Sequence, residues 1–94
     1  MADWMFAATN AKEEFSQLHF FSLKVPQDGR SVEFRITVRE FSKPNQLNML
    51  FYAEADPPTN QKTAPYIPTG WGPTLLVALS ECIKNIHRFP YEGD

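Results

Sequence analysis

The chain has few of the residues that catalytic and metal sites use. It contains a single cysteine, Cys82, and two histidines, His19 and His87. One thiol cannot form an internal disulfide, and these three residues match no zinc-ligand spacing. On one helix, Cys82 and His87 would point roughly 140° apart, which excludes a nucleophile–base pair. There is also no glycine-rich phosphate loop. We therefore expect no enzyme, no metal and no cofactor.

Long apolar runs and a strong net charge are also missing. No apolar run reaches the roughly 18 residues that span a bilayer, and the first residues lack the basic region of a signal peptide. The formal charge is −2, from 9 basic and 11 acidic residues, so no global attraction to nucleic acid or to an anionic membrane is expected. These features predict one cytoplasmic domain, residues 1–94, with no membrane partner.

The clearest pattern lies in residues 30–41, which alternate between apolar and polar side chains. The apolar set is Val32, Phe34, Ile36 and Val38; the polar set is Glu33, Arg35, Thr37 and Arg39. Such alternation predicts a strand with one buried and one solvent-facing side. One polar face is typical of an antiparallel sheet covered on one side only.

The other elements follow from similar patterns. Residues 15–25 and 47–55 are predicted strands, and 26–29 are a turn with an early proline and a late glycine. Residues 4–8 form either a strand, which we favour, or a helical turn. Residues 56–72 hold so many prolines that we expect no strand or helix there. Residues 74–88 are predicted to be a helix with Gly72 or Thr74 as its cap.

These elements predict an α+β fold, a three- or four-stranded antiparallel β-meander with one C-terminal α-helix packed on one face. The expected core combines the apolar face of residues 30–41 with a helical stripe. Its members are Val32, Phe34, Ile36, Val38, Leu75, Leu79, Ile83 and Ile86.

Two surfaces are candidate binding sites. On the polar sheet face, the cations Lys24, Arg35 and Arg39 could lie beside the ring of Tyr52, the combination that single-stranded nucleic acid uses. The alternative is a solvated face with cross-strand ion pairs. The second site is the loop before the helix, where an anion or small molecule could meet the helix N-terminus. Its residues are Tyr66, Gly70, Trp71 and Gly72. The alternative is that Trp71 fills the core and the glycines allow a sharp turn.

The order of four strands and a long helix, with Val38–Phe41 in a central strand, resembles the PC4-type single-stranded-DNA-binding coactivator domains. The resemblance covers residues 15–89 and is one of topology. It implies a homodimer built by helix and sheet. The proline-rich segment and the low basic content depart from that pattern, so no binding residue is carried over.

Several large apolar groups exceed what so small a domain would leave exposed, which predicts a homodimer. They are Leu18, Phe20, Leu50, Tyr52, Leu76 and Val77. The sequence thus favours a non-catalytic binding or assembly module, with single-stranded nucleic-acid binding as one alternative and small-molecule or anion binding as another.

Overall fold

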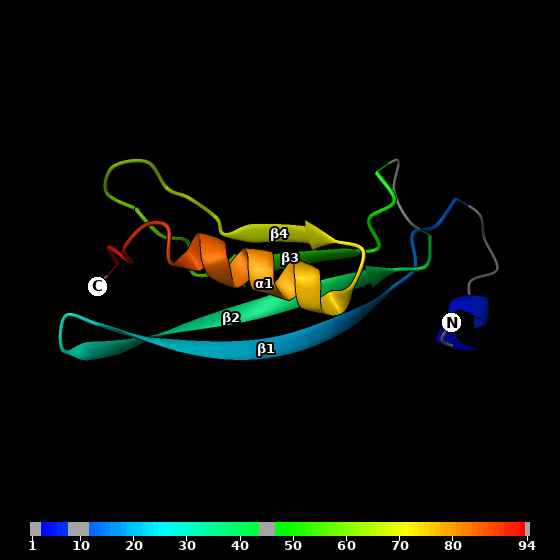
Figure 1. Cartoon of the computed structure of the whole chain (residues 1–94), viewed down its shortest axis with the longest axis horizontal. Helices are drawn as coiled ribbons and strands as arrows, with labels where there is room; N and C mark the ends of the chain where they lie inside the picture. Colours follow the sequence, from blue (N-terminus) through cyan, green and yellow to red (C-terminus); the bar gives the residue numbers. More distant parts are fainter. Residues whose placement is uncertain (1–2, 8–11, 44–46, 94) are drawn as a thin grey trace.

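The computed structural model describes residues 3–7, 12–43 and 47–93. They form a four-stranded antiparallel sheet with one α-helix lying across one face (Figure 1). Along the chain, the elements are the short 3-10 helix η1 Asp3–Ala7, then β1 Ser16–Gln27, β2 Arg30–Phe41, β3 Phe51–Asp56, β4 Thr69–Gly72 and α1 Leu75–Ile86. Each strand pairs with its neighbour in the sequence, in the order β1-β2-β3-β4. The predicted α+β meander is confirmed.

β2 has the two faces that its alternation predicts. Val32, Phe34, Ile36 and Val38 are all buried, at exposures of 7% or less. The residues between them face the other side and, except for the partly buried Thr37, are exposed. Burying each large aliphatic or aromatic side chain contributes about 1.5–3 kcal/mol. β2 therefore supplies the centre of the core.

The β1–β2 turn is tighter than predicted. Asp28 and Gly29 alone form it, with φ angles of 52° and 79°, and Gln27 pairs with Arg30. Positive φ at both central residues is characteristic of a type I′ turn. The backbone twist of this turn matches the right-handed twist of the two strands. Pro26 belongs to β1, opposite Ser31, rather than to the turn.

The proline-rich segment contains a strand that the sequence did not indicate. β4 lies between Pro68 and Pro73, and no proline falls within it. Hydrogen bonds from Leu50 N to Gly72 O and from Ala55 N to Pro68 O join its two ends to the β3 region. β3 itself begins four residues later than predicted. Asn48, with a φ of 60°, interrupts the extended chain before it.

The helix begins where the sequence predicts, and Thr74 is its cap. The Thr74 hydroxyl accepts a hydrogen bond from the backbone N–H of Val77. The buried side chains of α1 are Ala78, Cys82 and Ile86. Three predicted core residues, Leu75, Leu79 and Ile83, are only partly buried and flank this line. The prediction placed these three too deep and missed Ala78.

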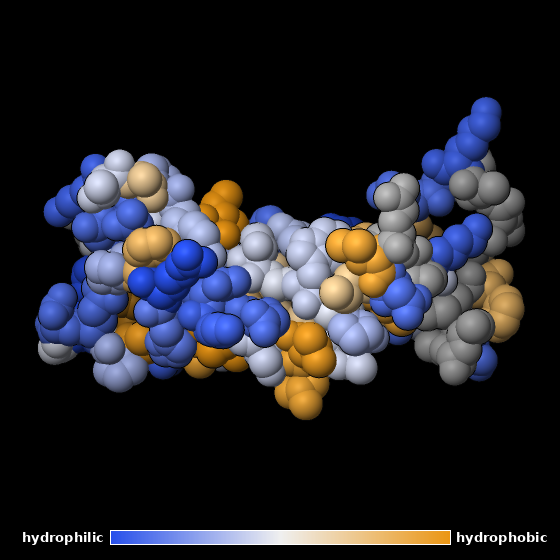
Figure 2. Space-filling view, turned by 45° about the horizontal axis from the view of Figure 1, so that its top comes forward, coloured by the Kyte–Doolittle hydropathy of each residue, from blue (hydrophilic) through white to orange (hydrophobic). Residues whose placement is uncertain are grey.

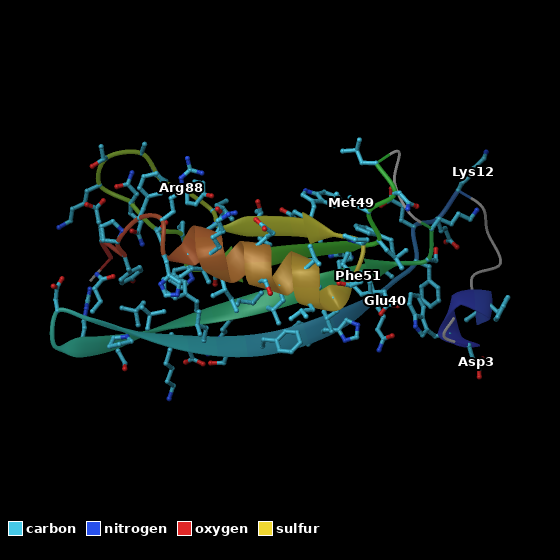
Figure 3. All side chains as sticks on the ribbon, in the orientation of Figure 1. Asp3, Lys12, Glu40, Met49, Phe51 and Arg88 are labelled. Atoms are coloured by element: carbon cyan, nitrogen blue, oxygen red, sulfur yellow. The ribbon has the colours of Figure 1, made fainter. Side chains whose placement is uncertain are left out.

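Two glycines explain why small side chains lie deepest. A Cβ on Gly70 would lie 2.4 Å from Ala78 O, and one on Gly72 would lie 2.7 Å from Ala78 N. The backbone of α1 therefore lies almost directly on β4. Phe51 lies beneath the N-terminal half of the helix (Figure 3). The helix packs mainly on β4 and β3, so the residues of β1 on the same face, such as Leu23 and Val25, are only half-buried.

The two ends of the chain pack at opposite ends of the sheet. Asp3–Ala7 is a 3-10 helix, so the favoured strand prediction was wrong there and the helical alternative was right; Ala8 lies outside the described residues. Trp4 meets Phe15 edge to face at 5.4 Å. At the other end, Tyr91 packs edge to face against Phe34 and accepts a hydrogen bond at its backbone oxygen from Gln27.

A candidate binding face on the sheet

The sheet surface opposite α1, called the open face here, gathers aromatic side chains at one end. The strand register places Arg39 between Leu18 and Tyr52, and Tyr52 beside Trp71, in one row across all strands. The Trp71 ring lies 4.6 Å from that of Tyr52 and stacks on Phe41 at 6.0 Å, with 14° between the planes. Phe41, Tyr52 and Trp71 are called the aromatic cluster below.

The aromatic cluster is accessible from solvent. Trp71 is 44% exposed, and Phe20, which lies in the next row on β1, is 72% exposed. Beside the cluster, Arg39 is exposed and donates a hydrogen bond from Nη1 to Ser16 Oγ at 3.0 Å. An accessible planar surface with a guanidinium at its margin can take a flat or anionic group.

The other end of the open face is balanced in charge. Lys24 lies opposite Glu33, and Arg35 lies opposite Asp56. The Ser22 hydroxyl donates to Glu33 at 2.7 Å. This hydrogen bond, with the nearby charges of Arg35 and Lys24, lowers the pKa of Glu33. Two of the predicted cations, Lys24 and Arg35, thus each face a carboxylate residue, whereas Arg39 faces Tyr52.

Tyr52 is held in place by its neighbours. Its hydroxyl donates a hydrogen bond to the Glu54 carboxylate at 3.0 Å. Partial burial and this hydrogen bond raise the pKa of Tyr52 to about 12. The ring is therefore neutral at physiological pH, and its orientation is fixed by both Glu54 and Trp71.

The structure divides the predicted loop site. Gly70 and Gly72 face α1, and Trp71 between them faces the open side because successive residues of a strand alternate. Trp71 therefore joins Tyr52 and Arg39. Tyr66 lies elsewhere, with its ring 5.1 Å from that of Phe89. The sequence signal that could have placed Trp71 beside Tyr52 is the Gly-Trp-Gly pattern of residues 70–72. If both glycines of a strand face the helix, the tryptophan between them faces the other side.

Two titratable groups on the helix side, Cys82 and His19, contact other parts of the fold. Cys82 is buried, and its thiol donates to Pro68 O at 3.5 Å. Burial raises the pKa of Cys82 to about 11, which disfavours the thiolate. His19 Nε2 lies 3.0 Å from Glu40 Oε1, a carboxylate partner that the sequence did not reveal. Glu40 lies opposite Phe51 (Figure 3).

The described residues contain neither a metal-binding cluster nor a membrane-spanning helix. Within residues 3–7, 12–43 and 47–93, no group of three or more His, Cys, Asp or Glu side chains could hold a metal ion. In the same ranges, no helix has the length and apolar character needed to cross a bilayer.

Comparison of the chain with protein-family models, with curated proteins and with solved structures found no match. The PC4-type resemblance stays a prediction.

Proposed function

We propose that this protein is a non-catalytic binding module that acts through the aromatic end of its open face. The observation that carries the proposal is the exposed aromatic cluster beside Arg39. Core aromatics are enclosed on all sides, whereas these rings pack against one another and keep one side open to solvent. Exposed groups of apolar side chains on small domains usually mark binding surfaces.

The stability of a Trp71→Ala variant tests whether the cluster serves binding rather than folding. The variant loses two ring contacts, each worth about 0.5–1.5 kcal/mol beyond area burial. Because Trp71 is 44% exposed, we expect its truncation to cost less than the roughly 3–5 kcal/mol that truncating a fully buried aromatic costs. Urea unfolding followed by far-UV circular dichroism measures it. A loss at the upper end of the core range would show that Trp71 is a structural residue and would overturn the proposal.

Single-stranded nucleic acid is the ligand class that the cluster favours. Bases of any sequence stack on aromatic rings, and a cation beside the rings contacts phosphate. Trp71 adds a second ring to the predicted Tyr52 and Arg39, in the same row of the sheet. Since Lys24 and Arg35 face carboxylate residues, Arg39 is the expected main phosphate contact.

Fluorescence anisotropy of a labelled oligothymidylate at several salt concentrations tests this ligand. Arg39→Ala should reduce the magnitude of the salt slope by about 0.7, the contribution of one neutralised phosphate in single strands. Tyr52→Ala and Trp71→Ala should each weaken binding by about 1–3 kcal/mol with little change of slope.

The matched control is Arg88→Ala, which removes the same charge beyond the C-terminal end of α1 (Figure 3). It should leave affinity unchanged. No binding at low salt would remove nucleic acid as the ligand. Equal effects of Arg39→Ala and Arg88→Ala would show that the attraction is not localised on the open face.

A further inference from the structure

β1 is a long strand with a partner on one side only. It has twelve residues and stands at the end of the strand order. Among the residues that the structure describes, no helix or strand lies beyond its lower edge in Figure 1. The opposite edge, β4, is only four residues long, and Asn85 on α1 donates a hydrogen bond to Thr69 O there. A long open edge offers unpaired backbone donors and acceptors to another strand, and proteins usually shorten or cover such edges.

The register identifies which backbone groups of β1 face outward. Phe15 O accepts a hydrogen bond from Ser42 N, so the backbone of Phe15 points toward β2. In an antiparallel pair this direction alternates, so the odd-numbered residues of β1 bond to β2 and the even-numbered ones face the open edge. The outward residues with an N–H are Ser16, Leu18, Phe20, Ser22 and Lys24. Pro26, the next outward position, has no N–H to leave unpaired.

We propose that a second copy of this chain pairs antiparallel with β1 along this edge, with the two-fold axis passing beside Phe20. In that register Phe20 faces Phe20 of the second copy, Leu18 faces Ser22, and Ser16 faces Lys24. Every outward N–H finds a partner strand, and the ladder ends before Pro26. Moving the axis toward Pro26 would oppose Ser16 with a residue that has no donor, and moving it the other way would shorten the ladder.

The side chains of β1 favour a second copy as the occupant. Phe20 and Leu18 are 72% and 41% exposed on the open face, and Phe21 is 37% exposed on the helix side. Pairing would bury apolar surface on both faces at once. Figure 2 shows hydrophobic side chains at the middle of the lower margin of the molecule in that view. Lys24, the one lysine or arginine in β1, would face neutral Ser16, so no two ammonium groups meet.

The six apolar residues from which the sequence predicted a homodimer do not form one patch in the structure. Leu18, Phe20 and Tyr52 belong to the open face, whereas Leu76 and Val77 are exposed on α1, on the other side of the sheet. Leu50 is partly buried against the core. The β1 edge uses Leu18 and Phe20, whereas the aromatic cluster lies on β2, β3 and β4.

Sedimentation of the full chain at tens of micromolar tests the proposal, and we expect a dimer. Ser22→Pro removes one outward N–H, as Pro26 already does at its position, and should give a folded monomer by far-UV circular dichroism. Ser22→Ala keeps the N–H and should remain dimeric. A monomeric wild-type chain, or a dimeric Ser22→Pro variant, would overturn the proposal.

Charge pairing at the axis gives a second test that does not depend on proline. Phe20→Lys places two ammonium groups opposite each other, and Phe20→Glu places two carboxylates there, so each variant alone should be monomeric. An equimolar mixture of the two should form a one-to-one dimer, because opposite charges then face each other. Failure of the mixture to associate, or dimerisation of either variant alone, would exclude an axis at Phe20.

Discussion

Gly70→Ala should be among the most damaging single-methyl additions in this protein. The new Cβ would lie 2.4 Å from Ala78 O and 2.6 Å from Cys82 N, both backbone atoms of α1. Real Cβ atoms essentially never approach closer than 3.0 Å, and a backbone atom cannot rotate away as a side chain can. The helix would therefore have to move off β4 by about 0.6 Å.

The cost follows from what that movement does to the core. A gap of about 0.5–1 Å forfeits a quarter to a half of the dispersion energy of each contact it opens. The contacts affected are those of the buried helix residues Ala78, Cys82 and Ile86. We expect a loss of about 3 kcal/mol, at the upper end of the range for overpacked cores. For a domain of this size, this corresponds to a decrease of roughly 12–24 °C in the melting temperature.

Thermal and urea unfolding monitored by far-UV circular dichroism measure this loss, and Gly29→Ala is the control. A Cβ on Gly29 meets nothing within 4 Å, so its only cost is the strain of a φ of 79°. That strain amounts to about 1–2 kcal/mol. If Gly70→Ala proved no more destabilising than Gly29→Ala, the close contact between α1 and β4 would be refuted.

Four further outcomes follow from single side chains. Cys82 should react with a thiol reagent far more slowly in the folded protein than in urea, because it is buried and its pKa is raised to about 11; equal rates would contradict this. Thr74→Ala should cost about 1 kcal/mol in urea unfolding, because the helix cap is lost, whereas Thr74→Ser should not. Tyr52, whose pKa is raised to about 12 from 10.0, should give an ultraviolet titration step that Tyr52→Phe removes. Its stabilising contribution should be complete below pH 10 and decline as the pH rises from there to 12. Ile36→Ala should cost about 2–5 kcal/mol, and Ile83→Ala should cost less because Ile83 is only partly buried.

Sequence reasoning succeeded where one physical signal dominates. β2 alternates between apolar and polar residues because one of its sides packs in the core and the other faces solvent. Thr74 could be predicted because it is a good N-cap residue at the start of the helix. Sequence reasoning failed where packing depends on a partner distant in the sequence. Ala78 lies deeper than Leu79 because glycines on β4 let the helix approach, and β4 itself lies among prolines that mask it.

The candidate site was predicted only in part, for a similar reason. Arg39 and Tyr52 were placed on one face from their own strands. Trp71 was assigned to a separate loop, since only the β3–β4 pairing brings it beside Tyr52. The carboxylates opposite Lys24 and Arg35 also depend on register, which alternation alone does not supply across strands.

The meander order has a consequence for how the chain folds. Residues 16–41 form a hairpin through a two-residue turn, and residues 51–86 form a second contiguous unit in which α1 packs on β3 and β4. The two units meet along the β2–β3 seam, where Ile36 pairs with Ala55 and Val38 with Ala53. The hairpin closes only a two-residue turn, whereas the β2–β3 pairing closes residues 42–50 and the β3–β4 pairing closes the longer connection 57–68, so both later steps cost more loop entropy. We therefore expect the pairing of β3 with its two neighbours to limit the folding rate, so that Ala53→Gly, at a position that pairs with both β2 and β4, slows refolding.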